Sequence, residues 1–349
     1  MADRTELGAF LVSRRARLRP EDTGLPDYGG RRRVAGLRRE EVAQLAGVST
    51  AHYTRLEQGR GDSVSDEVLS AIGRALRLDA DEAAYLRAIA RRPAVCAEPP
   101  VSPEAGTAAE PGADPEAGRG AGPEARAGAE PRTGRETDPE TDPEADPEAR
   151  TGARTGAHPE PGAEPGLADV PDRWRHLLGS LVLTPALLIG RHTQIVAWNP
   201  LASAVFGDLD AYAPGRRTFT HLLFAAPDRH ALFGAGWEQA AYAHVAHLRV
   251  LLGRFLGDRE LAGHITEMRR SSPDFARMWG EHPVARLRDR TYVLHHASAG
   301  ELVLHATLLA LPDAPDCVGL DVFAAKPGSR TETALRGLGE AERMPAVRI

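Results

Sequence analysis

Residues 37–60 of the chain read LRREEVAQLAGVSTAHYTRLEQGR, and this stretch holds two short helical patterns on either side of Gly47. A tight turn between two helices needs a residue that accepts a positive φ, which glycine does at low cost. The first helix also needs a small residue where the second crosses it, and Ala43 stands there. The apolar residues fall where the helices would face each other and a core: Val42, Ala46, Val48, Tyr53 and Leu56. The stretch therefore predicts a helix-turn-helix with its second helix turned outward.

An outward helix of this kind fits the major groove of duplex DNA and presents its N-terminal residues to base edges. We expect Ser49 to cap the helix and Thr50 to hydrogen-bond a base or a phosphate. Ala51 is suited to contact a thymine methyl group, and Arg55 to bind guanine through its paired donors. We expect Arg39, Gln58 and Arg60 to contact phosphates. The full set of residues in this stretch that are expected to bind DNA is Arg38, Arg39, Ser49, Thr50, Ala51, His52, Thr54, Arg55, Gln58 and Arg60.

An ordinary helical hairpin with a solvated basic face is the alternative interpretation of this stretch. The helix-turn-helix is favoured because the phases match over the whole stretch and because helical patterns flank it on both sides. An amphipathic pattern over residues 7–18 ends at Pro20, and two further patterns follow the motif, where Ser65 and Asp79 can act as N-caps. These patterns predict an all-α domain of five helices over residues 1–92.

Three arginines, Arg31, Arg32 and Arg33, lie in a Gly- and Arg-rich loop before the motif. Such a run can bind the phosphate backbone or enter a minor groove. A flexible, solvated run of charges explains the same residues equally well, and the sequence leaves both interpretations open.

The chain has 349 residues and a net charge of −6, which is distributed unevenly. Residues 1–92 carry 17 Arg against 14 Asp and Glu, a net +3, whereas residues 93–170 carry 6 Arg against 17 Asp and Glu, a net −11. Residues 97–170 contain no aromatic residue, so they cannot bury enough apolar surface to offset the entropy of ordering. We expect residues 93–170 to form a disordered linker, with a partner-binding tail or a DNA mimic as the alternative.

Residues 171–328 mix both types of secondary structure. A helical pattern over 172–181 precedes two short strands, ALLIG and QIVAW, and a long helical stretch covers 218–281. Three strand-like segments follow, RTYVLHHA, ELVLHATLLAL and CVGLDVFAA, and residues 329–349 are expected to be a tail. This order predicts an antiparallel sheet packed on helices, so the whole chain is expected to be α+β with two domains.

A domain of this kind offers a ligand pocket between its apolar strands and its long helices. Arg249 is a candidate partner for a carboxylate ligand, and a surface charge is the more ordinary interpretation. Asn199 is better explained as a helix cap than as a ligand contact. Simple core packing is the alternative for each of the apolar candidates for the pocket lining, which are Trp198, Phe206, Phe219, Leu223, Trp237 and Phe255.

The sequence contains no pattern typical of catalysis, of a metal site or of a cofactor site. His244 and His247 are three apart, as two metal ligands on a helix can be, but no carboxylate or cysteine completes the set. No serine stands in a G-x-S-x-G turn, and no phosphate-binding glycine motif follows a strand. The two cysteines lack a paired spacing, and no signal peptide or long apolar run is present. We expect a cytoplasmic protein that is not an enzyme and holds no cofactor.

Residues 36–60, GLRREEVAQLAGVSTAHYTRLEQGR, followed by SDEVLSAIGRALRLDADEAAYL at 65–86, resemble the lambda-repressor/Cro-like (XRE) helix-turn-helix. More closely, they resemble the MmyB-like regulators, over residues 7–92. The resemblance implies sequence-specific binding of duplex DNA, and an ion pair between Arg15 and Glu57 that fixes the recognition helix. The alternative for Glu57 is a solvated carboxylate, which is disfavoured because an unpaired anion near DNA would repel phosphate.

Trp198-Asn199-Pro200, FARMWGEHPV at 275–284 and the run over 295–329 resemble the ligand-binding domain of the same MmyB-like family. This resemblance covers roughly 171–340. It departs from the family at Ala297, where a proline is expected, and in the long linker. It implies a PAS-like fold, a five-stranded antiparallel sheet with helices over it, that binds a small apolar, fatty-acid-like molecule.

These patterns and resemblances together predict a ligand-responsive transcriptional regulator that binds double-stranded DNA. We expect a homodimer that reads two half-sites about one helical turn apart. A long disordered linker transmits strain poorly, so any coupling between ligand and DNA is expected to act through dimerisation of the C-terminal domain. Two alternatives remain: a C-terminal domain that only dimerises around a filled core, and an enzyme tethered to DNA by its N-terminal domain.

Overall fold

The computed structural model of the chain describes residues 2–24, 36–60, 64–91, 170–311 and 317–341. All of these residues belong to one compact unit. The arginine run at 31–33 and, apart from Val170, the expected linker at 93–170 lie outside the described residues, so the predictions made for them stay predictions.

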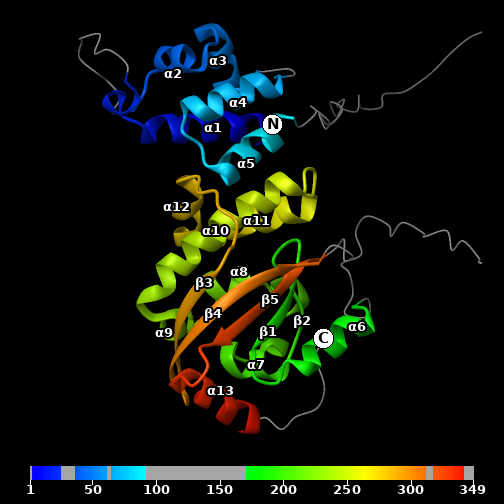
Figure 1. Cartoon of the computed structure of the whole chain (residues 1–349). Helices are drawn as coiled ribbons and strands as arrows, with labels where there is room; N and C mark the ends of the chain where they lie inside the picture. Colours follow the sequence, from blue (N-terminus) through cyan, green and yellow to red (C-terminus); the bar gives the residue numbers. More distant parts are fainter. Residues whose placement is uncertain (1, 25–35, 61–63, 92–169, 312–316, 342–349) are drawn as a thin grey trace, which may run out of the picture. The chain divides into compact units, whose positions relative to one another are not determined.

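The N-terminal part is helical, as the sequence predicts. Two of its expected caps are formed, because the side chain of Ser65 accepts a hydrogen bond from the Val68 amide at 3.3 Å and that of Asp79 accepts one from the Glu82 amide at 2.8 Å. The described helices, joined by loops and one short 3-10 turn at Pro20–Thr23, are α1 (Ala2–Arg17), α2 (Arg39–Ala46), α3 (Thr50–Glu57), α4 (Asp66–Ala75) and α5 (Ala80–Ala90) (Figure 1).

These five helices share one apolar core. Phe10 of α1 and Tyr85 of α5 meet edge to face, with ring centroids 5.2 Å apart. Val42 of α2 and the α3 residues Tyr53 and Leu56, which the sequence pattern placed on the inner faces, are at most 1% exposed. Burial of a large apolar side chain contributes about 1.5–3 kcal/mol, so these residues fix how α2 and α3 pack on the rest of the domain.

The C-terminal part is built on a five-stranded sheet with the strand order β2-β1-β5-β4-β3, in which every described pair of neighbours is antiparallel. The first and last strands in the chain, β1 and β5, are therefore neighbours, as in a PAS-like sheet. The strands are β1 (Ala186–Gly190), β2 (Ile195–Trp198), β3 (Arg290–His296), β4 (Gly300–Ala310) and β5 (Cys317–Ala325) (Figure 1). The antiparallel sheet expected from the sequence is confirmed.

Helices pack on both faces of this sheet. On one face, Trp174 and Leu178 of α6 pack with Leu188 of β1 and Leu320 of β5. On the other face, a larger core joins strand residues such as Leu187 to the remaining helices. The helices of this part are α6 (Asp172–Ser180), α7 (Pro200–Phe206), α8 (Phe219–Phe224), α9 (Arg229–Phe233), α10 (Trp237–Arg254), α11 (Arg259–Ser271), α12 (Pro273–Gly280) and α13 (Arg330–Ala341).

The helical stretch expected over 218–281 is divided into the five helices α8 to α12. Gly234 and Gly257 take positive φ values of 51° and 86°, which a continuous right-handed helix does not allow. Pro273 stands at the first turn of α12, where its missing amide hydrogen costs no helical hydrogen bond. The apolar pattern over 218–281 therefore belongs to several successive helices and not to one continuous helix.

The expected tail at 329–349 is wrong for its first part. Helix α13 covers Arg330–Ala341 and packs on α7 and β4, with Leu335 fully buried in the larger core. The hydroxyl of Thr331 accepts a hydrogen bond from the Val303 amide of β4 at 3.0 Å. The domain thus extends beyond residue 328, because this helix closes one end of its core.

The buried His247 and the half-buried His264 make the stability of the C-terminal part sensitive to acid. Burial lowers the pKa of His247 to about 3 and that of His264 to about 4. The unfolded chain protonates such rings near pH 6.5, so their contribution to stability is complete above that pH and is lost as the pH falls towards 4. We expect the free energy of unfolding to drop by up to about 1.4 kcal/mol per pH unit for each ring in this window.

Urea unfolding at pH 7, 6 and 5 measures this effect. His264→Leu removes one such ring, whose Nε2 has no partner among the described residues, and should make the dependence shallower. His176→Leu, at an exposed position of α6, is the matched control and should leave the dependence unchanged. An equal pH dependence in His264→Leu and the unaltered chain would contradict the prediction.

Candidate DNA-binding surface and candidate ligand site

The turn between α2 and α3 has the geometry that the sequence predicts. Gly47 has a φ of 68°, in the left-handed region. The Val48 amide donates to the Ala43 carbonyl at 2.9 Å, which closes the end of α2. The hydroxyl of Ser49 accepts a hydrogen bond from the His52 amide at 3.1 Å and caps α3. These bonds define where α3 starts and the direction in which it leaves α2.

Helix α3 has a buried face and an outer face. Tyr53 and Leu56 lie in the core, whereas Arg55 is exposed. The other residues predicted to contact DNA, in α3 and just after it, are also accessible to solvent. Thr50, Ala51, Gln58 and Arg60 are exposed, and His52 and Thr54 are half-buried. The outer face therefore carries one long cation and several small polar or methyl-bearing side chains, a set that suits base edges and phosphates.

Glu57, at the last turn of α3, is an anchor inside the domain. Its side chain is fully buried, and its carboxylate accepts hydrogen bonds from Arg15 Nε at 2.7 Å and from Arg39 Nε at 2.6 Å. Arg15 also donates to the Leu37 carbonyl at 2.6 Å. The expected pair of Arg15 and Glu57 is present, and the solvated alternative for Glu57 is wrong.

Arg39, predicted to contact a phosphate, is already bound to a carboxylate of the protein. Its Nε is bound by Glu57, and this hydrogen bond raises the pKa of the Arg39 guanidinium. About half of the side chain, 48%, remains exposed. Arg39 therefore neutralises a buried carboxylate first, and only its outward edge is available to an anion. Arg38, half-buried, is the N-cap residue before α2, and its backbone amide donates to the Glu41 carboxylate at 2.6 Å.

A close backbone contact, which the sequence analysis missed, also holds α3. A Cβ atom added to Gly8 of α1 would lie 2.1 Å from the backbone oxygen of Glu57, so only glycine allows the two helices to approach so closely. The available signal was a glycine inside the amphipathic pattern of α1, where glycine otherwise weakens a helix.

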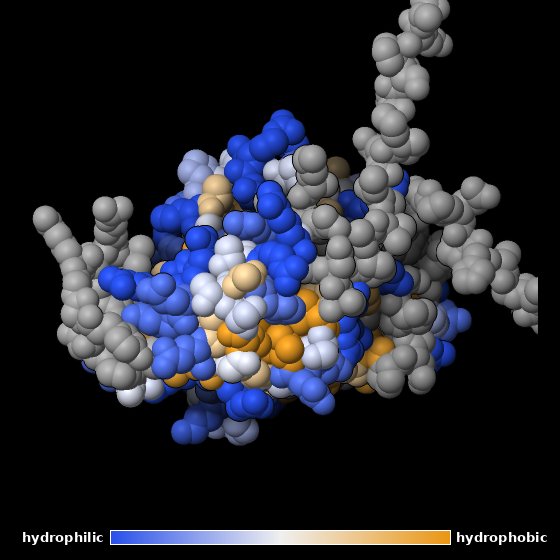
Figure 2. Space-filling model, turned by 90° about the horizontal axis from the view of Figure 1, so that it is seen from above, coloured by the Kyte–Doolittle hydropathy of each residue, from blue (hydrophilic) through white to orange (hydrophobic). Residues whose placement is uncertain are grey.

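The surface seen from above in the orientation of Figure 1 is mostly hydrophilic, with a small hydrophobic patch near the middle of the view (Figure 2).

The predicted lining of the ligand pocket lies in the core between the sheet and the helices. Phe206 of α7 and Phe219 of α8 have ring centroids 6.2 Å apart, and both lie within 6.4 Å of Phe323 of β5. Tyr292 of β3 joins them from the sheet. The other predicted residues in this core are Trp198, Leu223 and Trp237, all buried, and Phe255, which is partly buried against it. Tyr292 and Phe323 were missed, although strand alternation places both on the helix-covered face.

A chain of buried polar groups runs beside this aromatic cluster. The hydroxyls of Thr193 and Thr220 are 2.7 Å apart, and the Thr220 hydroxyl is 2.9 Å from His244 Nε2. Burial lowers the pKa of His244 well below its usual range, so the ring is neutral at pH 7. Nδ1 of His244 has no partner among the described residues. These hydrogen bonds were not predictable from the sequence, because Thr193, Thr220 and His244 lie far apart along it.

Arg249 is neither a ligand contact in the core nor a surface charge, so both expectations for it are wrong. The residue is 0% exposed, and its guanidinium donates to the backbone carbonyl of Trp279 and to the carboxylate of Glu6. It also stacks on the Trp279 ring at 4.0 Å from the centroid. The carboxylate that Arg249 binds belongs to the protein, at Glu6, and not to a ligand.

Asn199 is a structural cap, as expected. Its side-chain oxygen accepts hydrogen bonds from the Ala202 amide of α7 at 3.0 Å and from the Ala186 amide of β1 at 3.1 Å. Its amide nitrogen donates to the carbonyls of Leu181 and Thr184. Asn199 thus joins the start of α7 to the start of the sheet.

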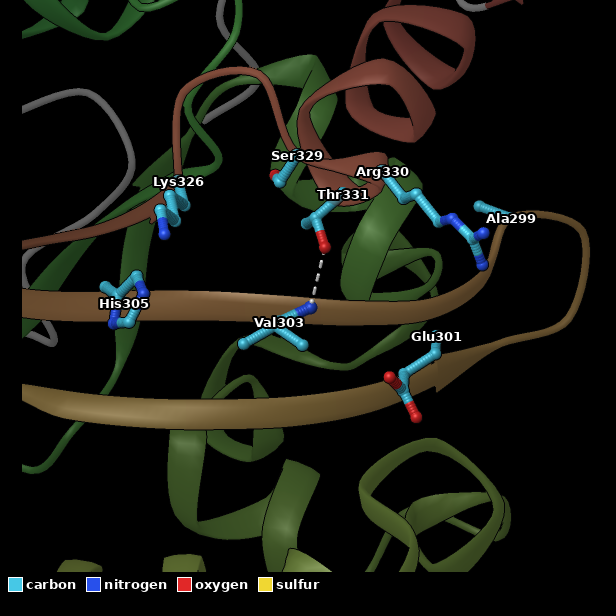
Figure 3. Close-up of a pocket in the computed structure, with 8 residues that line it drawn as sticks. All are labelled: Ala299, Glu301, Val303, His305, Lys326, Ser329, Arg330 and Thr331. Carbon is cyan, nitrogen blue, oxygen red and sulfur yellow. Dashed lines mark hydrogen bonds between the residues drawn. The ribbon is translucent and has the colours of Figure 1, made fainter.

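A polar hollow lies where α13 begins against β4 (Figure 3). The close-up shows Thr331 directed at the Val303 amide, with Lys326, Arg330 and Glu301 around the hollow. None of the predicted ligand residues lines it. The hollow contains none of the predicted aromatic residues and has the charged side chains of Glu301, Lys326 and Arg330 around it, so the candidate ligand site stays with the aromatic core.

Within the described parts of the chain, no helix is long and apolar enough to cross a membrane. The same residues contain no group of three or more His, Cys, Asp or Glu side chains that could hold a metal ion.

Two family models match the chain. Residues 170–338 match the MmyB-like transcription regulator ligand binding domain, and residues 6–86 match a helix-turn-helix domain. No curated protein matches the chain. The first match spans β1 to β5 and most of α13, and the second spans α2 to α4 and most of α1 and α5.

Proposed function

Because the chain belongs to the MmyB-like helix-turn-helix transcription regulators, we propose that it reads specific operators with the outer face of α3. One observation carries the proposal: Tyr53, Leu56 and Glu57 fix the inner face of α3 while Arg55 is left exposed on the other. A reading helix needs this division, because base discrimination depends on side chains whose backbone is held in place.

The roles proposed for the outer face follow from its chemistry. Arg55 binds guanine O6 and N7 in the major groove, Thr50 hydrogen-bonds a base or a phosphate, and Ala51 contacts a thymine methyl group. Gln58, Arg60 and the outward edge of Arg39 contact phosphates and set the register. The protein acts as a homodimer on two half-sites, with no catalytic step and no cofactor.

The C-terminal domain is proposed to take up a small apolar, fatty-acid-like molecule between the sheet and the helices. The aromatic cluster of Phe206, Phe219 and Phe323 supplies an apolar wall, and the hydroxyl and imidazole chain ending at His244 supplies polar groups beside it. This combination of an apolar lining with a few polar groups is typical of ligand sites.

A second candidate function for this domain is dimerisation alone. It is favoured by the close packing of the same aromatic rings on one another, which fills the core with side chains. Native mass spectrometry of the purified chain distinguishes the two, because a retained lipid favours the ligand site and its absence, with a dimer mass, favours dimerisation alone.

Selection of operators from random duplexes by the full chain, with and without a cellular lipid extract, tests the proposed function. We expect a two-fold symmetric motif to be enriched and its affinity to change with the extract. Enrichment of no motif would contradict operator reading, whereas an enriched motif that ignores the extract would contradict only the ligand response.

Loss of a phosphate contact should show in the salt dependence of binding. For Arg60→Ala we expect weaker binding to all duplexes alike and a decrease of about one unit in the slope of log affinity against log salt concentration. Arg269→Ala, at an exposed position of α11, removes the same charge from the C-terminal part and should leave the slope unchanged. Equal slopes for the Arg60 and Arg269 variants would contradict the phosphate contact.

A further inference from the structure

Helix α10 packs on both sides. One face carries Trp237, Ala241, Val245 and Leu248 into the core of the C-terminal domain. The opposite face, towards the end of the helix, contacts the N-terminal helices through Arg249, Val250 and Gly253. The last turns of α10 are therefore buried on two sides, by the core of the C-terminal domain and by the N-terminal helices.

A buried ion pair lies at the centre of this second face. The guanidinium of Arg249, which is inaccessible to solvent, donates to the carboxylate of Glu6 in α1. The Tyr85 hydroxyl of α5 donates to the same carboxylate at 2.8 Å, and the His282 ring lies 3.7 Å from it. Burial alone would raise the pKa of Glu6, but His282, Arg249 and Tyr85 together lower it to about 2. Glu6 is therefore ionised, and each charge loses its partner if the two helices separate.

Apolar packing surrounds the ion pair. Val284, in the segment after α12, is 6% exposed and belongs to the same core as Phe10 and Tyr85. A Cβ atom added to Gly253 would lie 2.8 Å from the Tyr85 ring and 3.5 Å from the Cβ of Ala88. The glycine thus lets α10 approach α5 more closely than any other residue would allow.

Ion pairs and hydrogen bonds form the edge of this surface. Arg14, 2% exposed, donates to the His282 carbonyl at 2.7 Å and pairs with Glu82 at 2.9 Å. Asp81 accepts a hydrogen bond from the Arg286 amide at 3.0 Å and lies 3.3 Å from the side chain of Arg288. The ion pair of Asp81 with Arg288 is more exposed than the central one and contributes less, but together these contacts fix the register of α5 against the segment 282–288.

The described contacts of this surface come from α1 and α5 on one side and from α10 and residues 279–288 on the other. The exposed residues of α3 take no part in them. Contact between the domains and contact with DNA therefore use different surfaces of the N-terminal domain.

We propose that the C-terminal domain holds the DNA-binding domain directly through this α10 surface, and that the protein binds DNA in this docked form. Since α10 also lines the core of the C-terminal domain, binding of a ligand in that core would shift α10 and so act on α1 and α5. This transmission rests on the proposed ligand function. A long linker does not prevent such docking, because the entropic cost of closing a flexible loop grows only slowly with its length.

Two variants, one on each side of the surface, test the docking in the full chain. Gly253→Trp inserts a large ring against Tyr85, and Gly263→Trp is its control, because a Cβ there meets nothing within 4 Å on α11. Glu6→Arg places a second cation against Arg249, and Glu67→Arg makes the same charge change at an exposed position of α4. Calorimetric unfolding and amide hydrogen exchange are measured for all four chains and for the unaltered chain.

We expect the unaltered chain and both controls to unfold in one transition, and Gly253→Trp and Glu6→Arg to unfold in two. In the latter pair, amides of α5 and of residues 282–288 should exchange at least about tenfold faster, while those of α3 and of β3 to β5 keep their protection. That retained protection separates undocking from misfolding. Two transitions in the unaltered chain, or variants that match their controls, would overturn the docking.

Amide hydrogen exchange of the full chain, measured with and without a selected duplex, tests whether the docked form is the one that binds DNA. We expect DNA to protect α2 and α3 and to leave residues 282–288 as protected as before. If the duplex protects α2 and α3 but makes 282–288 exchange faster, the DNA-binding form is undocked and the proposal fails. If no duplex protects α2 or α3, the failure is that of the proposed function.

Discussion

Glu57→Ala is expected to lower the free energy of unfolding of the helix-turn-helix domain by about 3–5 kcal/mol, because it leaves two arginines without the buried carboxylate that neutralises them. Arg15 is most affected, since only 13% of its side chain is exposed and its other donor is committed to the Leu37 carbonyl. The C-terminal end of α3 then loses its anchor. We expect operator affinity to fall with the stability, although the Glu57 side chain is buried away from the outer face of α3.

Native-state hydrogen exchange of the α2 and α3 amides in the full chain measures this loss. Glu67→Ala, at an exposed position of α4, is the matched control and should change the stability by less than about 0.5 kcal/mol. Equal exchange in the Glu57 and Glu67 variants would mean that the buried ion pairs do not hold the recognition helix.

Arg55→Ala is expected to lower the affinity for a selected operator by about 1–3 kcal/mol, or about 5- to 150-fold. The loss should be larger for the operator than for random duplex, because a base contact contributes to discrimination and a phosphate contact does not. Stability should stay within about 0.5 kcal/mol, since the side chain is exposed. Arg74→Ala, an exposed arginine in the last turn of α4, is the control for loss of charge alone.

Binding of both variants to the selected operator and to random duplex at one salt concentration provides the comparison. The predicted base contact would be contradicted if Arg55→Ala weakened binding to the two duplexes by the same factor, or if it bound as Arg74→Ala does.

The helix-turn-helix was predictable because its determinants are local. The positive φ of Gly47, the cap at Ser49 and the burial of Tyr53 and Leu56 all follow from residues within one short stretch. The second role of Arg39 was not predictable in this way. Its partner Glu57 is 18 residues away, and the two meet only after α2 and α3 have crossed.

The strands of the C-terminal domain were also predictable, since alternation and turn residues mark each of them. The division of 218–281 into separate helices was not predictable, because an isolated glycine inside an apolar helical pattern is tolerated and Gly234 and Gly257 do not mark helix ends by themselves. Helix α13 was missed because its sequence is mostly polar and its apolar residues in the core, Ala334, Leu335 and Leu338, are few.

The docking of the two domains was the largest feature that the sequence analysis missed. A long acidic linker suggested that the domains act separately, and this led Arg249 to be interpreted only as a ligand contact or a surface charge. In the structure His244 to Arg249 are six consecutive buried positions of α10, more than a helix packed on one side can bury, but half of these residues are polar and do not indicate burial in the sequence. Glu6 could not be identified as the partner, because nothing in the sequence relates α1 to α10.

Methylation interference on a selected operator tests most directly the claim that α3 reads the major groove through Arg55. Methyl groups on guanine N7 project into the major groove, and those on adenine N3 into the minor groove. We expect guanine methylation in each half-site to block binding of the unaltered chain, and the interference at one of these guanines to disappear with Arg55→Ala. Interference from adenine N3 alone, or a pattern that Arg55→Ala leaves unchanged, would contradict the account.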